Sequence, residues 1–408
     1  MSPPETPKPS GKTALAVAII VGTRPEAIKL APVALALRAR PGVEAWIWCS
    51  GQHPAWASEM LAYFDLQPDL LLDLPPRSTG LAQLASLMLS GMQAAIEDLR
   101  PDVVVVQGDT ATAFAGALAA AYAGVPVVHV EAGLRSSDRR MPFPEEAHRR
   151  AIAQFTALHC APTLKAADAL LAEGFAPGEI LESGNTVIDA LRLIAPLTPA
   201  NDPVSELGCP LILLTCHRRE SWGAPYRAVC AAARRLASRN DCEIVFVVHP
   251  NPELAQVARD LLSDCPRVRL VPPLGYPDFM HMVRRATLVL TDSGGVQEEA
   301  AALGTPLLIL RDTTERPEGV EAGTARLIGT DEEVIVASVQ ALLDHPATLA
   351  AMRIPCTQYG DGFAAERIAA AIAARWKDAR APGGGRQVPG RAAQMIEAAA
   401  LTGSIVPA

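Results

Sequence analysis

The chain has 408 residues, half of them hydrophobic and a fifth charged, and its formal net charge is −8. This length accommodates two domains with full hydrophobic cores. The acidic balance excludes a nucleic-acid binder that works through bulk positive charge. The longest apolar runs, such as residues 13–21, stop well short of a membrane span. A small anionic ligand stays compatible with the composition, because local arginines and helix N-termini bind anions whatever the net charge.

Residues 1–12 are rich in proline and polar side chains. We expect a flexible extension there rather than a signal peptide, since no small-residue cleavage site follows. The eight cysteines are scattered, without C-x-x-C spacing or close histidines. This pattern predicts reduced core thiols in a cytoplasmic protein and no metal site.

Strand and helix signals alternate along almost the whole chain. Short runs rich in valine and isoleucine are separated by longer alanine- and leucine-rich stretches, which is typical of parallel sheets covered by helices. The first series of predicted strands is 14–21, 43–49, 103–106, 125–130 and 157–161. The second series is 210–216, 243–248, 268–271, 287–290 and 306–310.

The predicted fold class is therefore α/β, with two Rossmann-like domains facing each other across a cleft. The first domain is expected over 13–196 and the second over 209–362, with a proline-containing linker at 197–208 between them. A closing helix is expected over 363–378. The glycine-rich residues 379–408 show little periodicity and are expected to be mostly disordered.

Polar residues of the first domain follow its predicted strands, at the carboxyl ends where open α/β sheets bind ligands. Gly22 suits a turn into a helix, and Arg24 and Lys29 place positive charge near that turn. Asp109 follows a later strand, either as a helix N-cap or as a functional carboxylate. Glu131 closes a hydrophobic strand, a position that costs free energy unless a partner or ligand is present.

Glu145 and Glu146 open a helix after two prolines, where the helix dipole favours acidic side chains. Together with Arg149 and Arg150 they have the i,i+4 spacing of ion pairs on a helix surface. A structural and a functional interpretation both stay open for this segment.

Ser293-Gly294-Gly295 lies between a predicted strand and an alanine-rich helix. Two glycines at such a turn let backbone amides approach a phosphate, and the helix start adds partial positive charge. A plain strand-turn-helix is the alternative. Glu298 or Glu299, one turn into the helix, can accept hydrogen bonds from a ribose attached to that phosphate.

His217, Arg218 and Arg219 cluster at another strand end, which suits a diphosphate because arginine binds phosphate oxygens in a bidentate fork. His249 closes the next strand, where a structural role is more common. The polar run 311–318 is either a salt-bridged surface loop or part of the ligand site. One domain thus collects carboxylates and the other phosphate-binding groups, which indicates proton transfer on a diphosphate-activated group.

Taken together, these motifs closely resemble the non-hydrolysing UDP-N-acetylglucosamine 2-epimerases. The matching segments are 22–33, 107–110, 129–135, 144–150, 184–190, 217–220, 291–299 and 311–318. The resemblance implies a glycosyltransferase-B-like architecture, a homodimer and no cofactor. It also implies reversible C2 epimerisation of UDP-GlcNAc to UDP-ManNAc by anti elimination of UDP and syn re-addition through 2-acetamidoglucal. The product would serve the synthesis of cell-surface polysaccharide precursors.

Carried onto this sequence, the resemblance assigns roles by position. The acid/base and active-site groups would be Asp109, Glu131, Glu145 and His217. The groups that hold UDP would be Arg24, Lys29, Ser293, Gly294, Gly295, Glu299 and Arg316. A second, activating UDP-GlcNAc pocket would use Gln52, Arg218 and His249.

Three places depart from the family pattern. Cys216 precedes the His-Arg-Arg-Glu motif where the family carries glycine or threonine, and His148 stands where the family carries asparagine. Pro54-Ala55 lacks the polar side chain that usually helps to hold the activator. The alternatives are a 2-epimerase of a related UDP-diacetamido-uronic acid, a glycosyltransferase of the same fold, and a non-catalytic nucleotide-sugar sensor.

Overall fold

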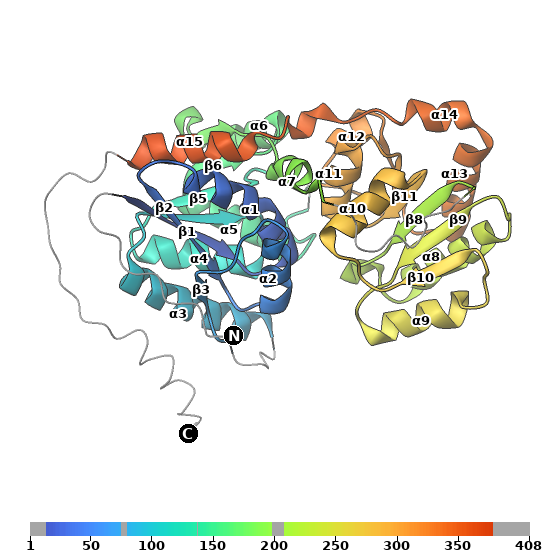
Figure 1. Ribbon diagram of the computed structural model, residues 1–408, viewed down its shortest axis with the longest axis horizontal. Coiled ribbons are helices and arrows are strands. Elements are labelled where there is room, and N and C mark those ends of the chain that lie inside the picture. Colours follow the sequence, from blue (N-terminus) through green and yellow to red (C-terminus); the bar gives the residue numbers. More distant parts are fainter. Residues whose placement is uncertain (1–13, 75–79, 137, 198–207, 378–408) are drawn as a thin grey trace, which may run out of the picture. The chain divides into compact units, whose positions relative to one another are not determined.

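The computed structural model describes residues 14–74, 80–136, 138–197 and 208–377. The expected N-terminal extension, nearly all of the expected linker and the expected tail lie outside these residues. The described chain forms two units, which Figure 1 shows in the colours of the sequence. The first contains the described residues up to Ala190 and again from Gly360, and the second is Leu191–Tyr359.

The first unit is built on a parallel sheet of seven strands in the order β3-β2-β1-β4-β5-β6-β7. Its strands are β1 (Leu15–Val21), β2 (Val43–Cys49), β3 (Leu70–Leu71), β4 (Val103–Gln107), β5 (Val127–Val130), β6 (Thr156–Ala161) and β7 (Ile180–Glu182). Every residue of β1 is buried. Such a continuous apolar strand is stable only where helices cover both faces of the sheet.

Helices α3, α4 and α5 contact one another in series, and α1 contacts both α2 and α15. The helices of this unit are α1 (Arg24–Arg38), α2 (Pro54–Ala62), α3 (Leu81–Leu99), α4 (Ala111–Tyr122), α5 (Glu145–Phe155), α6 (Leu164–Ala172), the 3-10 turn η1 (Pro177–Glu179), α7 (Thr186–Ile194) and α15 (Ala364–Trp376). The last residues of α7 already belong to the second unit. Helix α15 lies within residues 363–378, where a closing helix was expected, and it belongs to the first unit.

The second unit has a parallel sheet of six strands in the order β10-β9-β8-β11-β12-β13. Its strands are β8 (Leu211–Thr215), β9 (Glu243–Val247), β10 (Val268–Val271), β11 (Leu288–Thr291), β12 (Leu307–Ile309) and β13 (Ala325–Leu327). Its helices are η2 (Arg219–Ser221), α8 (Ala224–Ala237), α9 (Pro252–Leu262), α10 (Tyr276–Arg285), α11 (Gly294–Ala302), α12 (Glu318–Glu321), α13 (Glu332–Asp344), α14 (Pro346–Ala351) and η3 (Thr357–Tyr359).

The predicted α/β class and all ten predicted strands are confirmed. The sequence pattern missed β3, β7 and β13, which have two or three residues and lie at sheet edges. So short a strand has no hydrophobic run of its own and is defined by its hydrogen-bonded neighbour. No helix in the described ranges is both long and apolar enough to cross a membrane.

The strand order reverses between β1 and β4 in the first unit, and between β8 and β11 in the second. At such a switch point the following loops diverge and leave a crevice at the carboxyl ends of the strands, where α/β proteins bind ligands. The expected functional residues follow these strands or their neighbours in both units. The cleft expected between the two domains stays a prediction.

Candidate functional site

Glu131 directly follows β5 and has a left-handed backbone conformation, with a φ of 62°. For a glutamate this conformation costs on the order of 1–3 kcal/mol. Its carboxylate is buried, accepts a hydrogen bond from Gln107 Nε2 at 2.7 Å and forms an ion pair with Lys29. Residues retained in strained conformations are concentrated at functional sites, so the backbone itself marks this carboxylate as a candidate.

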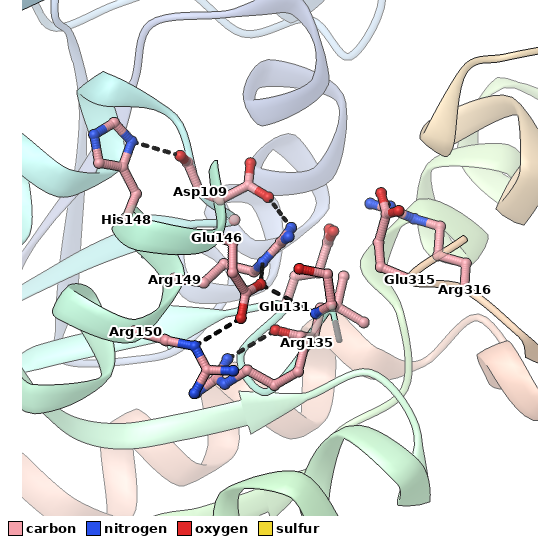
Figure 2. A network of polar contacts seen from close by, with 12 residues as sticks. Asp109, Glu131, Arg135, Glu146, His148, Arg149, Arg150, Glu315 and Arg316 are labelled. Carbon is pink, nitrogen blue, oxygen red and sulfur yellow. Dashed lines mark hydrogen bonds and ion pairs between the residues drawn. The ribbon is translucent and has the colours of Figure 1, made fainter. Parts of the chain in front are cut away.

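Helix α5 holds Asp109 through both its side chain and its backbone, as Figure 2 shows. Arg149 Nη1 donates to Asp109 Oδ2 at 2.5 Å, and His148 Nδ1 donates to the Asp109 carbonyl oxygen at 2.9 Å. Thr110 is the N-cap of α4, since its hydroxyl oxygen accepts the Ala113 N–H at 3.0 Å. The N-cap interpretation of Asp109 is therefore wrong, and its side chain serves the ion pair instead.

The two glutamates that begin α5 have different surroundings. Glu146 is fully buried and pairs with Arg149 at 2.9 Å and with Arg150 at 2.8 Å. Oε2 of Glu145 is also buried, but within the described ranges it has no hydrogen-bond partner. The ion pair expected between Glu145 and Arg149 does not form among the described residues, because Arg149 pairs with Asp109 and Glu146 instead. A buried, unpartnered carboxylate oxygen is costly and suits a group that meets a ligand.

The loop after β1 places Arg24, which is half-buried, at the start of α1. Glu26 is fully buried and accepts hydrogen bonds from Gly22 N–H at 2.9 Å, Thr23 N–H at 2.7 Å, the Thr23 hydroxyl at 2.9 Å and the Thr110 hydroxyl at 2.5 Å. Burial raises the pKa of Glu26 to about 7 despite these donors. Glu26 thus joins the loop after β1 to the loop after β4 across the switch point.

In the second unit, His217 follows β8 and its Nε2 donates to the Val247 carbonyl oxygen at 3.1 Å. Because a carbonyl only accepts, this contact determines the tautomer of a neutral His217 ring. The His249 ring lies 5.3 Å from the His217 ring, and Trp222 packs edge-on against His249 at 5.6 Å. Burial, followed by the neighbouring His217, lowers the pKa of His249.

The predicted strand-to-helix turn at Ser293 is confirmed. Ser293 is the N-cap of α11, and Gly294 and Gly295 form its first turn. A side-chain Cβ at Gly294 would lie 2.8 Å from Arg316 Nη1 and 3.2 Å from Arg218 Nη2. Glycine at this position therefore lets two guanidinium groups reach the helix N-terminus, where an anion is most favourable.

Three arginines surround Glu315 beside this helix start. Arg316 forms an ion pair with it, Arg311 lies at 2.9 Å, and Arg218 lies at 3.2 Å. Burial favours the neutral acid, but the arginines prevail and hold the pKa of Glu315 well below its usual range. Arg316 Nε also donates to Glu298 at 2.6 Å (Figure 2 labels Glu315 and Arg316). Glu298 is thus engaged by Arg316.

Residues 35–373 match the sequence model of the family described as UDP-N-acetylglucosamine 2-epimerase. The chain belongs to this family. The resemblance found in the sequence motifs is thereby confirmed over most of both units.

Several UDP-N-acetylglucosamine 2-epimerases are similar to this chain over nearly their full length. The UDP-N-acetylglucosamine 2-epimerase of Bacillus subtilis is 42% identical over 356 residues, which cover 87% of this chain and 94% of the relative. That of Escherichia coli K12 is 41% identical over 367 residues, covering 87% and 98%. The crystal structure of the Neisseria meningitidis enzyme bound to UDP-GlcNAc has 36% identity and a TM-score of 0.85, covering 88% of this chain and all of that one.

The residues expected in the second pocket of the 2-epimerase family lie in different units. Gln52 belongs to the first unit, where its Oε1 accepts the Thr112 hydroxyl at 2.7 Å. Arg218 and His249 belong to the second, beside Glu315 and His217 respectively. The expected second pocket stays a prediction.

Sequence patterns alone did not single out Gln107 or Arg149, although both lie in segments that resemble the 2-epimerases. Gln107 ends β4 and contacts the carboxylate that follows β5. Arg149 has the spacing of an ordinary helix-surface ion pair, yet it is 2% exposed and reaches the loop after β4. The adjacency of β4 and β5 could have pointed to Gln107 from the sequence. No local sequence pattern distinguishes a buried arginine such as Arg149 from an exposed one.

Proposed function

We propose that this chain interconverts UDP-GlcNAc and UDP-ManNAc by inverting C2 of the sugar. The observation that carries the proposal is the division of chemistry between the units. The first unit holds three candidate carboxylates, two after strands β4 and β5 and one at the start of α5. The second gathers arginines around a helix N-terminus that suits a diphosphate. Family membership and the Neisseria relative bound to UDP-GlcNAc support the same substrate.

In the proposed reaction, a carboxylate removes the C2 proton and the C2–H electron pair becomes the C1–C2 double bond. The C1–O bond breaks in the same elimination, and its electrons leave with UDP as 2-acetamidoglucal forms. Return of a proton to the opposite face of C2 and re-addition of a UDP oxygen to C1 complete the inversion. Elimination is anti and re-addition is syn. Carbon is neither oxidised nor reduced overall, so the cycle as written needs two proton-transfer groups and no external oxidant.

We assign the proton-transfer chemistry to Asp109, Glu131 and Glu145. Arg149 and Lys29 orient the first two through ion pairs. Glu145 has a buried oxygen that lacks a partner among the described residues, which supports a direct contact with substrate. General acid–base catalysis by positioned carboxylates typically contributes 10²–10⁴-fold in rate. We therefore expect turnover to fall by a factor in this range when one of the three carboxylates is replaced by a neutral amide.

We assign the UDP portion to the second unit. Ser293, Gly294 and Gly295 begin α11 and offer backbone N–H groups to phosphate oxygens, with Arg316 beside them. Glu299 would accept the ribose hydroxyls, since Glu298 is engaged by Arg316. His217 would act near the diphosphate. Arg24 and Lys29 of the first unit would support the same ligand.

We also propose that the protein works as a homodimer in the cytoplasm and supplies precursors of cell-surface polysaccharides. Six of the eight cysteines are buried and all eight are free thiols, which fits a reducing compartment. The dimer and the polysaccharide role rest on the family resemblance.

The deciding experiment is proton NMR of the purified protein with UDP-GlcNAc in deuterated water. Appearance of UDP-ManNAc with deuterium at C2 is the expected result. Accumulation of free ManNAc and UDP would instead indicate a hydrolase. If neither product appears while UDP-GlcNAc still binds, a sensor or a different nucleotide-sugar substrate becomes the better assignment.

A further inference from the structure

Asp292 directly follows β11, immediately before the Ser293-Gly294 turn, and its side chain is completely buried. A buried negative charge next to a candidate diphosphate site opposes anion binding through Coulomb repulsion. A buried aspartate at this position is therefore expected to have a role that outweighs this repulsion, and its hydrogen bonds indicate that role.

Within the described residues, the hydrogen bonds to the Asp292 carboxylate come from the loop after β8. The His217 N–H donates to Oδ1 at 2.8 Å and to Oδ2 at 3.0 Å, and the Arg218 N–H donates to Oδ2 at 2.8 Å. The Ser221 hydroxyl donates to Oδ2 at 2.7 Å. Hydrogen bonds to an ionised acceptor are roughly twice as strong as neutral ones, so this carboxylate holds the whole loop.

The strands beneath this carboxylate are joined at the same level. β8 and β11 are adjacent, with Thr215 in register with Thr291, and their hydroxyl groups hydrogen-bond at 2.6 Å. Asp292 extends this connection by one residue into the crevice at the switch point. Glu26 occupies the equivalent crevice of the first unit, where it joins the loops after β1 and β4.

We propose that Asp292 is a positioning residue that fixes the His217 loop against the Ser293-Gly294 turn. It holds the His217 and Arg218 backbone through their N–H groups and does not use either side chain. This inference rests on the proposed epimerisation, because turnover reports the position of His217. Asp292 itself does not touch substrate.

The proposal predicts different effects on turnover and on UDP binding. Asn at this position keeps the shape of aspartate, but one of its two terminal atoms is an N–H donor. One of the backbone N–H groups that now donate to Asp292 would therefore face the amide N–H of the asparagine, which is also a donor. The His217 loop would shift, whereas removal of a buried negative charge would favour the diphosphate. A general loss of folded structure would instead lower turnover and UDP binding together.

The test compares Asp292→Asn with wild type in the full-length chain, by steady-state kinetics with UDP-GlcNAc and by calorimetric titration with UDP. The expected result is a fall in kcat of at least about tenfold, with KM and the Kd for UDP changed less than about threefold. The His217 imidazole signals in a proton–carbon NMR spectrum should also move. Asp331→Asn is the matched control, since Asp331 accepts a backbone N–H as N-cap of α13 in the same unit.

Ser221→Ala provides a second variant that leaves the buried charge in place and removes one donor. It should reduce kcat by a smaller factor, about threefold, without weakening UDP binding. Unchanged kcat in a folded Asp292→Asn protein, or an equal loss of turnover and UDP binding, would overturn the proposal. An inactive wild-type protein would refute the proposed function instead, so the two failures are distinguishable.

Discussion

The carboxylates of the first unit differ in what holds each of them. Glu131 has a strained backbone and two buried polar partners, Asp109 has an arginine and a histidine, and Glu145 keeps one buried oxygen unpartnered among the described residues. Neutral isosteres therefore test their charge with little change in shape.

Asp109→Asn and Glu131→Gln should each reduce turnover by about 10²-fold or more, because a neutral amide cannot accept the proton. UDP binding should change less than about threefold, since Ser293, Gly294, Gly295, Glu299 and Arg316, the main groups proposed to hold UDP, lie in the second unit. Steady-state kinetics and titration with UDP measure the two quantities. Asp168→Asn on the exposed face of α6 is the control and should behave as wild type. Near-normal turnover of either test variant would refute the role assigned to that carboxylate.

At the scale of one element, α5 supplies consecutive residues that hold Asp109. The His148 ring also stacks on Phe114 of α4, with 4.9 Å between centroids and 4° between ring planes. The family resemblance implies an asparagine at this position, and either residue can donate an N–H to the Asp109 carbonyl oxygen.

His148→Ala should therefore lower kcat by about fivefold to tenfold, because Asp109 loses its backbone contact to α5 and keeps only its side-chain ion pair with Arg149. His148→Asn should retain most of the activity, since the amide restores a donor. Kinetics of both variants at neutral pH provide the measurement. Equal activity of the alanine and asparagine variants would show that the hydrogen bond does not position Asp109.

Strands β5 and β6 place two buried histidines side by side. His129 is in register with His159, and burial lowers the pKa of each to about 4. Neither ring nitrogen of His159 has a hydrogen-bond partner within the described ranges, and its ring lies against Phe175. In the unfolded chain the pKa of a histidine is about 6.5. Between pH 6.5 and 4 the unfolded chain therefore binds more protons than the folded one.

The contribution of His159 to stability is thus fully present above about pH 6.5 and is lost as the pH falls toward 4. His159→Leu removes this titration and a buried polar group. Its free energy of unfolding relative to wild type should rise as the pH is lowered, by on the order of 1–3 kcal/mol at pH 4.5. Urea unfolding at pH 7.5, 6.0 and 4.5 tests this. A pH-independent difference for His159→Leu would contradict the assignment.

At the scale of the whole molecule, the chain leaves the first unit after Ala190 and returns to it at Gly360. Asp189 is completely buried at this point, and its carboxylate accepts the Ala364 N–H at 3.2 Å and the Ala365 N–H at 2.9 Å. One side chain near the exit thus caps α15, the helix that re-enters the first unit. Burial raises the pKa of Asp189 to about 6.

Asp189→Ala should lower the free energy of unfolding by about 2 kcal/mol, because it leaves buried N–H groups without an acceptor. Limited proteolysis should release α15 earlier than in wild type. Asp331→Ala, at an exposed N-cap, should cost less, about 1 kcal/mol. Thermal denaturation gives the comparison, and an Asp189 variant as stable as wild type would show that α15 docks without this cap.

Local sequence determined which residues form the strands of both sheets, because a strand covered on both faces must be a short apolar run. It also placed Asp109, Glu131, His217 and Ser293 at strand ends, since the residue after such a run is the first to be polar. The edge strands β3, β7 and β13 escaped it, because strands of two or three residues are defined by pairing with a neighbour rather than by their own side chains.

Only the tertiary structure decided what these side chains contact. Arg149 binds Asp109 rather than Glu145, and Asp292 binds the loop after β8, 71–75 residues away in sequence. Parallel strand order brings such distant loops to one edge of a sheet, and no local periodicity encodes which loops will meet. The sequence by itself therefore determined the family, the strands and the candidate groups. The partners of those groups follow from strand order, because burial makes each charged side chain take whichever partner the adjacent loop offers.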